Sequence, residues 1–588
     1  MLTSLVQLFT RGLFGPIFER EVRVVGRRKS TYWVRGAYVL GLAALATLVY
    51  FVITADLRFG TSSRAEALLT LQSFAPALAA FYIWFQFLAL CFVSSTLTAG
   101  TICDERRKGS FSALLTTPLT LSQILLGKLA GRLTQTFILL AAGLPLLLAT
   151  RVFGGVSVQF IAAAFAITAS VALLHASVAI TASCRMRTAT AASSSGLLVG
   201  ILWCLLPLIA SLIAAILRFN TVSQHLLTAS PYVALGLETA ASFGVIGPQG
   251  KLFPWYFGCW YALAGALLFL LTALFRLRHI ARLAGEPSAA PQRRKAKPGK
   301  HRTAQHTGSM VSNNPVLWRE LRQPLFFKPW YPWAGTLLIA GVLGFGFYHT
   351  SWADTNTVIF VSVIGLLLWG FQSAVIATGS IAGERESRSL EVLLTTPMTA
   401  RSIIRAKWLG ALRKIIPAPL FLFVFLLICG PLSAKLNWVL LPHLALLTVP
   451  PAALFCAIGL WLSVVCRRAV TSSTINILIA LGLWAALPML GAAIAAITGS
   501  ALQAQTQKWT FYPLLLINPA PMCLTAFNGA QEQIWSGPGI PRYQSFYPFT
   551  LYSFTVASIC YAAGYSLLTA IALWGASRAL ARRTNRAV

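Results

Sequence analysis

The chain has 588 residues, of which 57% are hydrophobic and only 10% are charged, whereas soluble domains carry about 25% charged residues. Lys and Arg number 47 against 14 Asp and Glu, and this excess follows the positive-inside rule of membrane proteins better than it indicates nucleic-acid binding. The composition excludes collagen-like and disordered chains, and ten scattered Cys without a CxxC pair indicate neither a disulfide scaffold nor a metal site.

Apolar runs dominate the sequence and predict an all-α polytopic membrane protein. A helix needs about 20 mostly apolar residues to cross the hydrocarbon core. Twelve runs come close to this length, and in chain order they lie near 34–54, 77–101, 133–150, 157–183, 194–217, 256–275, 331–349, 357–382, 415–432, 438–465, 472–498 and 549–577.

Loop charges predict the orientation of these twelve helices. Every second loop is rich in Lys and Arg, while the alternate loops carry few for their length. We expect the protein to lie in the plasma (bacterial inner) membrane. Because the number of spans is even, both termini are then expected on the cytoplasmic side. In this orientation, Cys103 would react with impermeant thiol reagents only from the cytoplasm and Cys523 only from outside.

Four pairs of segments recur in the same order and indicate an internal duplication. The clearest pair is ERRKGSFSALLTTPLTLSQILLGK at 105–128 and ERESRSLEVLLTTPMTARSIIRAK at 384–407, with eleven identities over 24 ungapped positions. The other pairs are GPIFEREVR at 15–23 with NPVLWRELR at 314–322, Cys184-Arg185 with Cys466-Arg467, and LWCLLP at 202–207 with LWAALP at 483–488.

The duplication divides the chain into two tandem six-helix repeats, at 1–275 and 314–588. The residues between them, 276–313, predict a flexible linker, since their first part holds nine Lys or Arg against one acid, Glu286. Attraction to anionic lipid explains this basic run better than nucleic-acid binding.

Acidic residues are scarce, and none lies inside a predicted span. Ion-driven carriers generally need a carboxylate on the ion path, and intramembrane hydrolases need a nucleophile with a base, paired aspartates or HExxH. None of these patterns occurs, so we expect no catalytic residue and no enzyme activity on this chain. His175 and His443 are isolated within apolar runs and are expected to have hydrogen-bonded structural roles.

The two LLTTP loops predict a short amphipathic helix in each repeat, over 110–117 and 389–396. Ser110 is expected to cap the first helix, a Pro ends it, and Thr120 with Gln123 forms a capping box that starts the next helix. Such a helix could pack on the membrane surface or bind a partner, and its occurrence in two copies favours partner binding.

This pattern of an E-R lead-in, LLTTP and a following I-x-x-x-K resembles the first cytoplasmic loop of ABC type-2 permeases, the membrane subunits of ATP-driven exporters. The segments at 15–23 and 314–322 resemble the amphipathic elbow helix of that family. The resemblance covers both halves and implies two fused permease units. It also implies two copies of a separate ATPase subunit as partners, with ATP and magnesium on that partner and no cofactor on this chain.

The resemblance assigns roles to residues at the matching positions. ATPase coupling would involve Glu105, Arg106, Ser110, Phe111, Leu114, Leu115, Thr116, Thr117, Pro118 and Lys128 in the first repeat, and Glu384, Arg385, Ser389, Leu390, Leu393, Leu394, Thr395, Thr396, Pro397 and Lys407 in the second. The elbow helices would contribute Glu19, Arg20, Glu21, Arg319, Glu320 and Arg322. The first copy departs from the family's LExLL stretch, because Ser112 stands where the second copy has Glu391.

The repeated Trp-Pro pairs suggest a transport pathway. Trp203 and Pro207 share one helix face, as do Trp484 and Pro488, and each proline frees the carbonyl four residues earlier. We predict that both tryptophans face each other across the midline of the two repeats, although packing kinks with lipid-facing rings are the alternative.

Three functions are compatible with this sequence. The leading one is the permease subunit of an ABC exporter, since GxxxxGK[ST] is absent and the ATPase must be a separate chain. A secondary carrier of six-plus-six architecture and a non-transporting membrane anchor or scaffold are the alternatives. The absence of acids from the predicted spans counts against the carrier.

Overall fold

The fold was analysed in a computed structural model in which every regular element is a helix within the described residues. Apart from a few single positions, these residues are 15–26, 64–151, 156–186, 188–216, 219–243, 254–285, 314–322, 372–386, 389–417, 440–466, 469–483 and 551–587.

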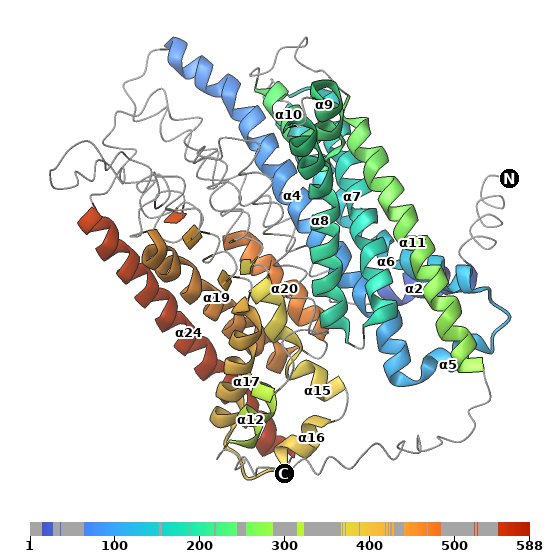
Figure 1. The fold of residues 1–588 in the computed structure, drawn as a ribbon, viewed down its shortest axis with the longest axis vertical. Coiled ribbons are helices and arrows are strands. Elements are labelled where there is room, and N and C mark those ends of the chain that lie inside the picture. The colour runs from blue at the N-terminus through green and yellow to red at the C-terminus, as the bar shows by residue number, and fades with distance from the viewer. Residues whose placement is uncertain are drawn as a thin grey trace.

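The helices follow one another in the same general order in both halves of the chain (Figure 1). The first half contains α2 (Gly15–Gly26), α4 (Arg64–Lys108), α5 (Ser110–Leu115), α6 (Leu121–Thr150), α7 (Val158–Arg185), α8 (Ala189–Ile216), α9 (Asn220–Ala229), α10 (Pro231–Ser242) and α11 (Tyr256–Gly285). The second contains α12 (Pro315–Arg322), the 3-10 turn η3 (Ala377–Gly379), α15 (Ala382–Glu386), α16 (Ser389–Leu394), α17 (Ala400–Ile415), α19 (Leu440–Val465), α20 (Ala469–Leu481) and α24 (Leu551–Ala587).

Seven of the described helices are long and apolar enough to cross a membrane, which confirms a polytopic all-α membrane protein. They coincide with the predicted runs near 77–101, 133–150, 157–183, 194–217, 256–275, 438–465 and 549–577. The runs at 34–54 and 331–349 lie outside the described residues, and those at 357–382, 415–432 and 472–498 are described only in part. The total of twelve spans therefore stays a prediction.

Several helices extend beyond the predicted boundaries, among them α4 and α11. Helix α4 continues to Lys108 and so includes Asp104 and Glu105, which the sequence placed beyond the span. Helix α11 continues to Gly285, so the beginning of the predicted linker at 276–313 is helical. In both cases polar residues extend the helix beyond its apolar part, where charged side chains can reach water.

Helix α7 lies at the centre of the first repeat and packs against α4, α8 and α11. Phe87, Phe160 and Leu174 are almost fully buried in the resulting core. Gln86 donates from Nε2 to the carbonyl of Leu140 at 2.8 Å and so joins α4 to α6. In the membrane, such a polar side chain has to find its partner on a neighbouring helix.

Helix α19 takes the corresponding central place in the second repeat, packed against α24, α20 and η3. The amide of Asn476 on α20 donates to the carbonyls of Ala374 at 2.6 Å and Phe455 at 3.0 Å. The predicted structural role of His443 is confirmed by its Nε2, which lies 3.1 Å from the hydroxyl of Thr555.

The two repeats meet where α4 and α8 contact α20 (Figure 1). Leu197 of α8 and Ile477 of α20 are buried in one cluster that also holds Val375. The hydroxyls of Thr96 and Thr474 lie 3.3 Å apart across this interface. The described helices therefore form one packed assembly in which both repeats contribute to a shared core.

Three side chains differ from the sequence-based expectations. Cys103 and Cys523 are both buried, so neither thiol can serve as the accessible probe that was expected. His175 is fully buried, and neither of its ring nitrogens has a hydrogen-bond partner among the described residues. A hydrogen-bonded role is thus not observed for His175.

Candidate functional site

The loop helices α5 and α16 lie at the same general end of the molecule, the lower end in Figure 1. Helix α5 begins after Gly109, whose φ of 74° lies in the left-handed region that favours glycine. The predicted cap by Ser110 is therefore wrong, because Ser110 is the first helical residue and Gly109 occupies the cap position without a side-chain bond.

The apolar face of each loop helix turns toward the protein itself. Phe111 is buried in α5, and Leu115 packs against the same cluster of α4, α6, α7 and α11 side chains. In α16, Leu390 is buried while Leu393 and Leu394 pack against the corresponding cluster of the second repeat. These residues anchor the loop helices, so they do not form the main surface that a partner would contact.

The opposite faces of α5 and α16 are open to solvent. They expose Ser112, Ala113, Thr116, Thr117 and Pro118 in the first copy, and Glu391, Val392, Thr395, Thr396 and Pro397 in the second. The Val392 side chain is 70% exposed, which makes it the most prominent apolar group on this surface. The two copies differ in charge and size, since Ser112 and Ala113 correspond to Glu391 and Val392.

The helices that follow the loops start as predicted. Thr120 accepts a hydrogen bond from the Gln123 amide at 3.3 Å, and the Gln123 side chain accepts from the Thr120 amide at 3.1 Å. This confirms the capping box at the start of α6. In the second copy, Thr399 caps α17 by accepting from the Ser402 amide at 3.3 Å.

A buried lysine joins each of these helices to the lead-in of its loop. Lys128 pairs with Glu105 in the first repeat, and Lys407 pairs with Glu384 at 2.8 Å in the second. Both lysines are almost fully buried, with exposures of 4% and 3%. The structure thus brings together four residues that the sequence had placed on either side of the loops, and each pair holds a loop helix in position.

The arginine of each lead-in binds the end of the central helix. Arg106 donates to the carbonyl of Cys184 at 2.8 Å, and Arg385 donates to the carbonyls of Cys466 at 2.7 Å and Val464 at 2.8 Å. These carbonyls lie at helix C-termini, where no intrahelical partner is available and a cation is favourable.

A buried serine, which the sequence analysis missed, sits beside each arginine. The hydroxyl of Ser183 accepts from the amides of Ile102 and Cys103 at 3.1 and 3.0 Å. The hydroxyl of Ser463 accepts from the corresponding amides, those of residues 381 and 382, at 3.1 and 2.8 Å. The two serines occupy equivalent places, so Cys184 corresponds to Val464 and not, as the sequence suggested, to Cys466.

The segments that resemble elbow helices form α2 and α12, which pack against α6 and α17, respectively. In the first copy Glu21 lies 3.5 Å from Arg132, while Glu19 and Arg20 are exposed. In the second copy, Arg322 is exposed and its guanidinium lies 4.2 Å from the centre of the Trp318 ring.

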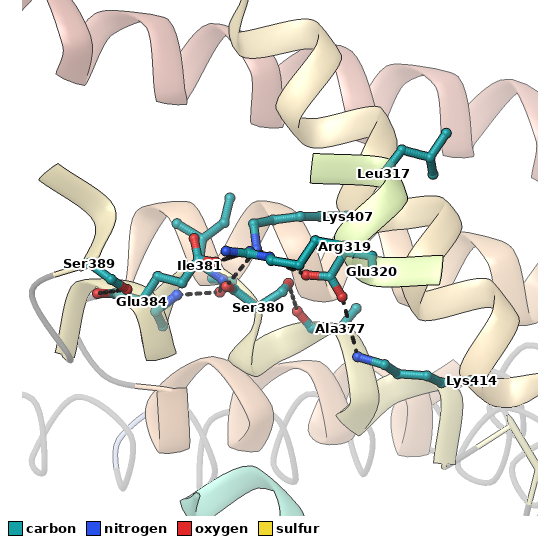
Figure 2. A network of polar contacts seen from close by, with 12 residues as sticks. Leu317, Arg319, Glu320, Ala377, Ser380, Ile381, Glu384, Ser389, Lys407 and Lys414 are labelled. Carbon is teal, nitrogen blue, oxygen red and sulfur yellow. Dashed lines mark hydrogen bonds and ion pairs between the residues drawn. The ribbon is translucent and has the colours of Figure 1, made fainter. Parts of the chain in front are cut away.

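Helix α12 makes the denser set of ion pairs (Figure 2). Glu320 lies 3.5 Å from Lys407 and 3.4 Å from Lys414, and Arg319 lies 2.7 Å from Glu384. Burial by itself would raise the pKa of Glu320, but the nearby Lys407, Lys414 and Arg319 outweigh it and lower that pKa. Lys407 therefore connects the elbow segment, the loop lead-in and α17.

A glycine allows each elbow segment to approach its neighbour. A Cβ atom at Gly131 would lie 2.6 Å from Cβ of Glu21, and one at Gly410 would lie 2.7 Å from Cβ of Glu320. Both distances are too short for real side chains, so any other residue would push α2 or α12 away.

We therefore expect Gly410→Ala to destabilise the protein by about 1–3 kcal/mol through overpacking. The higher helix propensity of alanine would offset up to about 1 kcal/mol of this loss. Thermal unfolding in detergent would measure this change. Gly383→Ala is the matched control, because nothing lies within 4 Å of a Cβ at Gly383. Equal stability of the two variants would contradict the close approach of α12 to α17.

An ion pair also connects the two repeats at the level of the loops. Arg107, near the end of α4, pairs with Glu386, the last residue of α15. These are equivalent positions in the aligned loops, so the two copies of one site meet each other. Glu386 also accepts from the amide of Ala469 at 3.0 Å, at the start of α20.

The predicted pathway residues are described only in the first repeat. Tyr261 donates to the carbonyl of Trp203 at 3.0 Å, which satisfies the group that Pro207 frees. The Trp203 ring packs within its own repeat against Tyr261 and Phe269, with centroids 5.5 and 5.4 Å away. The Trp203 ring is thus directed toward its own repeat, which speaks against the prediction that it faces the other repeat. Trp484 and Pro488 lie outside the described residues.

A comparison with known protein families matches the chain to the ABC-2 family transporter protein over residues 16–242 and again over residues 292–573. The chain belongs to the ABC-2 transporter family. Because both halves match the same family, this ABC-2 transporter is a duplication of one membrane unit. It is a transmembrane transport subunit and is not itself catalytic. A search of curated proteins gives no match.

Among the described residues of this ABC-2 transporter, no group of three or more His, Cys, Asp or Glu side chains is arranged to hold a metal ion. The polar network at the loops is built instead from ion pairs and carbonyl contacts, which fix the position of α5 and α16.

Proposed function

We propose that this chain is the permease subunit of an ATP-driven exporter in the plasma membrane, with both termini in the cytoplasm. Two copies of a separate ATPase subunit would bind α5 and α16 and transmit the closure of their nucleotide sites to the membrane helices. The observation that carries this proposal is the repeated loop module, in which a short helix is held by a buried Lys–Glu pair, an arginine and a serine.

The contacts of the module suit the transmission of force. In each copy, the lead-in just before the loop helix is tied to the central helix of its repeat through Arg106 or Arg385, and to the following helix through Lys128 or Lys407. A push on the exposed face of α5 or α16 would therefore reach several membrane helices together. ATP and magnesium would belong to the partner, since the sequence has no P-loop.

The carrier alternative gains no support from the described spans. The carboxylates in these spans, Asp104 and Glu105, lie at the loop end of α4, and Glu105 is paired with Lys128. Proton- and ion-driven transport generally uses carboxylates deeper in the membrane.

The test is to place charge on the exposed faces of the loop helices. We expect Val392→Glu and Ala113→Glu to weaken copurification of the ATPase subunit by tenfold or more, because an apolar contact would then bury a carboxylate. The effect should be larger at Val392, which has the larger apolar side chain and is 70% exposed. Affinity purification with quantitative mass spectrometry would measure the bound ATPase.

Val222→Glu serves as the control, because Val222 is 49% exposed on α9, away from the loop helices. Insertion should be unchanged in all three variants. If both loop variants retained the ATPase as well as the control does, α5 and α16 would not be its binding surface.

A further inference from the structure

A groove lined by three arginines lies beside the elbow segment of the second repeat. It has a volume of about 800 Å³ and lies between Asn314, just before α12, the start of α17, and α24. Its polar lining consists mainly of Asn314, Arg401, Ser402, Arg405, Ser577 and Arg578. None of the described residues that line it is acidic, so its charge is strongly positive.

The arginines are placed where the helix itself disfavours them. Arg401 and Arg405 are four residues apart in the first turns of α17, so they share a face and repel each other. The N-terminus of a helix also carries partial positive charge, which disfavours cations there. An anion bound between these side chains would remove both penalties.

The first repeat supplies an internal comparison. By the alignment of the loops, Arg401 and Arg405 correspond to Ser122 and Leu126. On the last helix, Ala576 and Leu580 occupy the buried places of Ala273 and Leu277 in the matching clusters, which aligns Arg578 with Phe275. The fold thus forms without these arginines in one copy, and the three arginines are specific to the second.

The surface next to the groove indicates what kind of anion fits. Leu567, Ile571 and Trp574 are 64%, 51% and 49% exposed, and with Arg578 they lie on one face of α24. The Arg578 guanidinium lies 3.8 Å from the centre of the Trp574 ring. An exposed tryptophan at the end of an apolar stripe is typical of the membrane interface.

We propose that this groove binds the phosphate headgroup of an anionic phospholipid from the cytoplasmic leaflet, with an acyl chain along the exposed stripe of α24. The arginines would bind the phosphate, while Leu567 and Ile571 would contact the chain. The positive-inside rule accounts for an excess of cations on this side, but it does not account for their convergence in one groove with an apolar approach.

The test uses the full chain, purified in detergent and incubated with phosphatidylglycerol or phosphatidylcholine. Native mass spectrometry then counts the lipids that are retained. We expect selective retention of phosphatidylglycerol, weakened roughly fivefold for each arginine replaced in R401Q, R405Q and R578Q. The matched control, R276Q/R278Q/R282Q, removes three exposed arginines from the end of α11 and should leave retention unchanged.

The reciprocal variant, S122R/L126R/F275R, should create a second retained phosphatidylglycerol in the first repeat. Equal retention by the wild type and the triple glutamine variant would overturn the proposal. Displacement of the lipid by glycerol phosphate at equal concentration would also overturn it, because the site would then recognise a soluble phosphate. Loss of the ATPase partner without loss of lipid would reassign the groove to protein binding.

Discussion

Lys407→Met is expected to destabilise the second repeat by about 3–5 kcal/mol, the usual cost of removing one partner from a buried ion pair. The Nζ atom of Lys407 lies 2.8 Å from Glu384 and 3.5 Å from Glu320, and it also donates to the carbonyl of Ser380 at 3.3 Å (Figure 2). Without it, two mostly buried carboxylates would lose a cation that they share.

Lys128→Met in the first repeat is the matched comparison. Lys128 pairs with Glu105, whose side chain is 25% exposed, compared with 16% for Glu384 and 9% for Glu320. Water can therefore solvate the carboxylate that remains in the first repeat more easily, and we expect a smaller loss of stability there. Thermal unfolding of both variants in the same detergent would measure the difference.

A rescue variant separates the charge effect from packing. In Lys407→Met combined with Glu384→Gln and Glu320→Gln, the two carboxylates that Lys407 neutralises are removed as well, so part of the lost stability should return, less the contribution of the pairs that Arg319 and Lys414 make with them. If this variant were no more stable than Lys407→Met alone, the ion pairs would not be the reason for the loss. If Lys128→Met were the more harmful single change, the order of burial would not determine the cost.

Local patterns in the sequence were sufficient for much of the fold. Apolar runs located seven long helices, and the Thr120–Gln123 pair located the start of α6, because both signals depend on residues close in the chain. The loop alignment also identified Glu105 and Lys128, although it could not show that they pair. Their contact depends on how α4 packs against α6, which no local pattern contains.

The features that were missed depend on tertiary contacts. Ser183 and Ser463 are unremarkable in sequence, yet each accepts two backbone amides from a neighbouring segment. The amphipathic pattern of α5 showed that one face would be buried, but not that the protein's own helices would cover it. The inward direction of Phe111 could be known only from the packed structure.

The register of the repeats shows a further limit of sequence comparison. Ser183 and Ser463 are 280 residues apart, as are Leu197 and Ile477, whereas the two LWxxLP segments are 281 apart. A π-helical turn at 482–483 lies at this point, and such a turn accommodates one extra residue. The match between Cys184 and Cys466, in contrast, is two residues out of this register, although both carbonyls accept from a lead-in arginine.

The duplication explains why the residues at positions 107 and 386 carry opposite charges. Arg107 and Glu386 are equivalent positions that meet across the pseudo-two-fold axis of the two repeats. In a symmetric dimer of identical subunits, such a position would face its own copy, and two identical charges would repel each other. In the fused chain one copy is basic and the other acidic, so the contact is attractive. Helix α5 begins shortly after Arg107, and α16 begins shortly after Glu386, so this pair connects both loop helices.

Charge reversal tests this connection. Arg107→Glu and Glu386→Arg each place like charges opposite one another, and we expect each to reduce stability. If the ATPase binds the loop helices, each should also reduce coupled ATP hydrolysis. The double variant R107E/E386R restores opposite charges and should recover much of both. The coupling energy from this double-mutant cycle should be about 1–3 kcal/mol, since the side chains are only 23% and 17% exposed.

The double variant should not be exactly equivalent to the wild type, because Glu386 also accepts from the amide of Ala469 at the start of α20. From the equivalence of the repeats, a glutamate at position 107 is expected to face the start of α8, where Thr188 already accepts from the amide of Ala191 at 3.3 Å. We therefore expect Glu386→Arg to be the more harmful single change. Additive effects of the two reversals, measured by thermal unfolding, would show that Arg107 and Glu386 do not interact and that the loops are joined by other contacts.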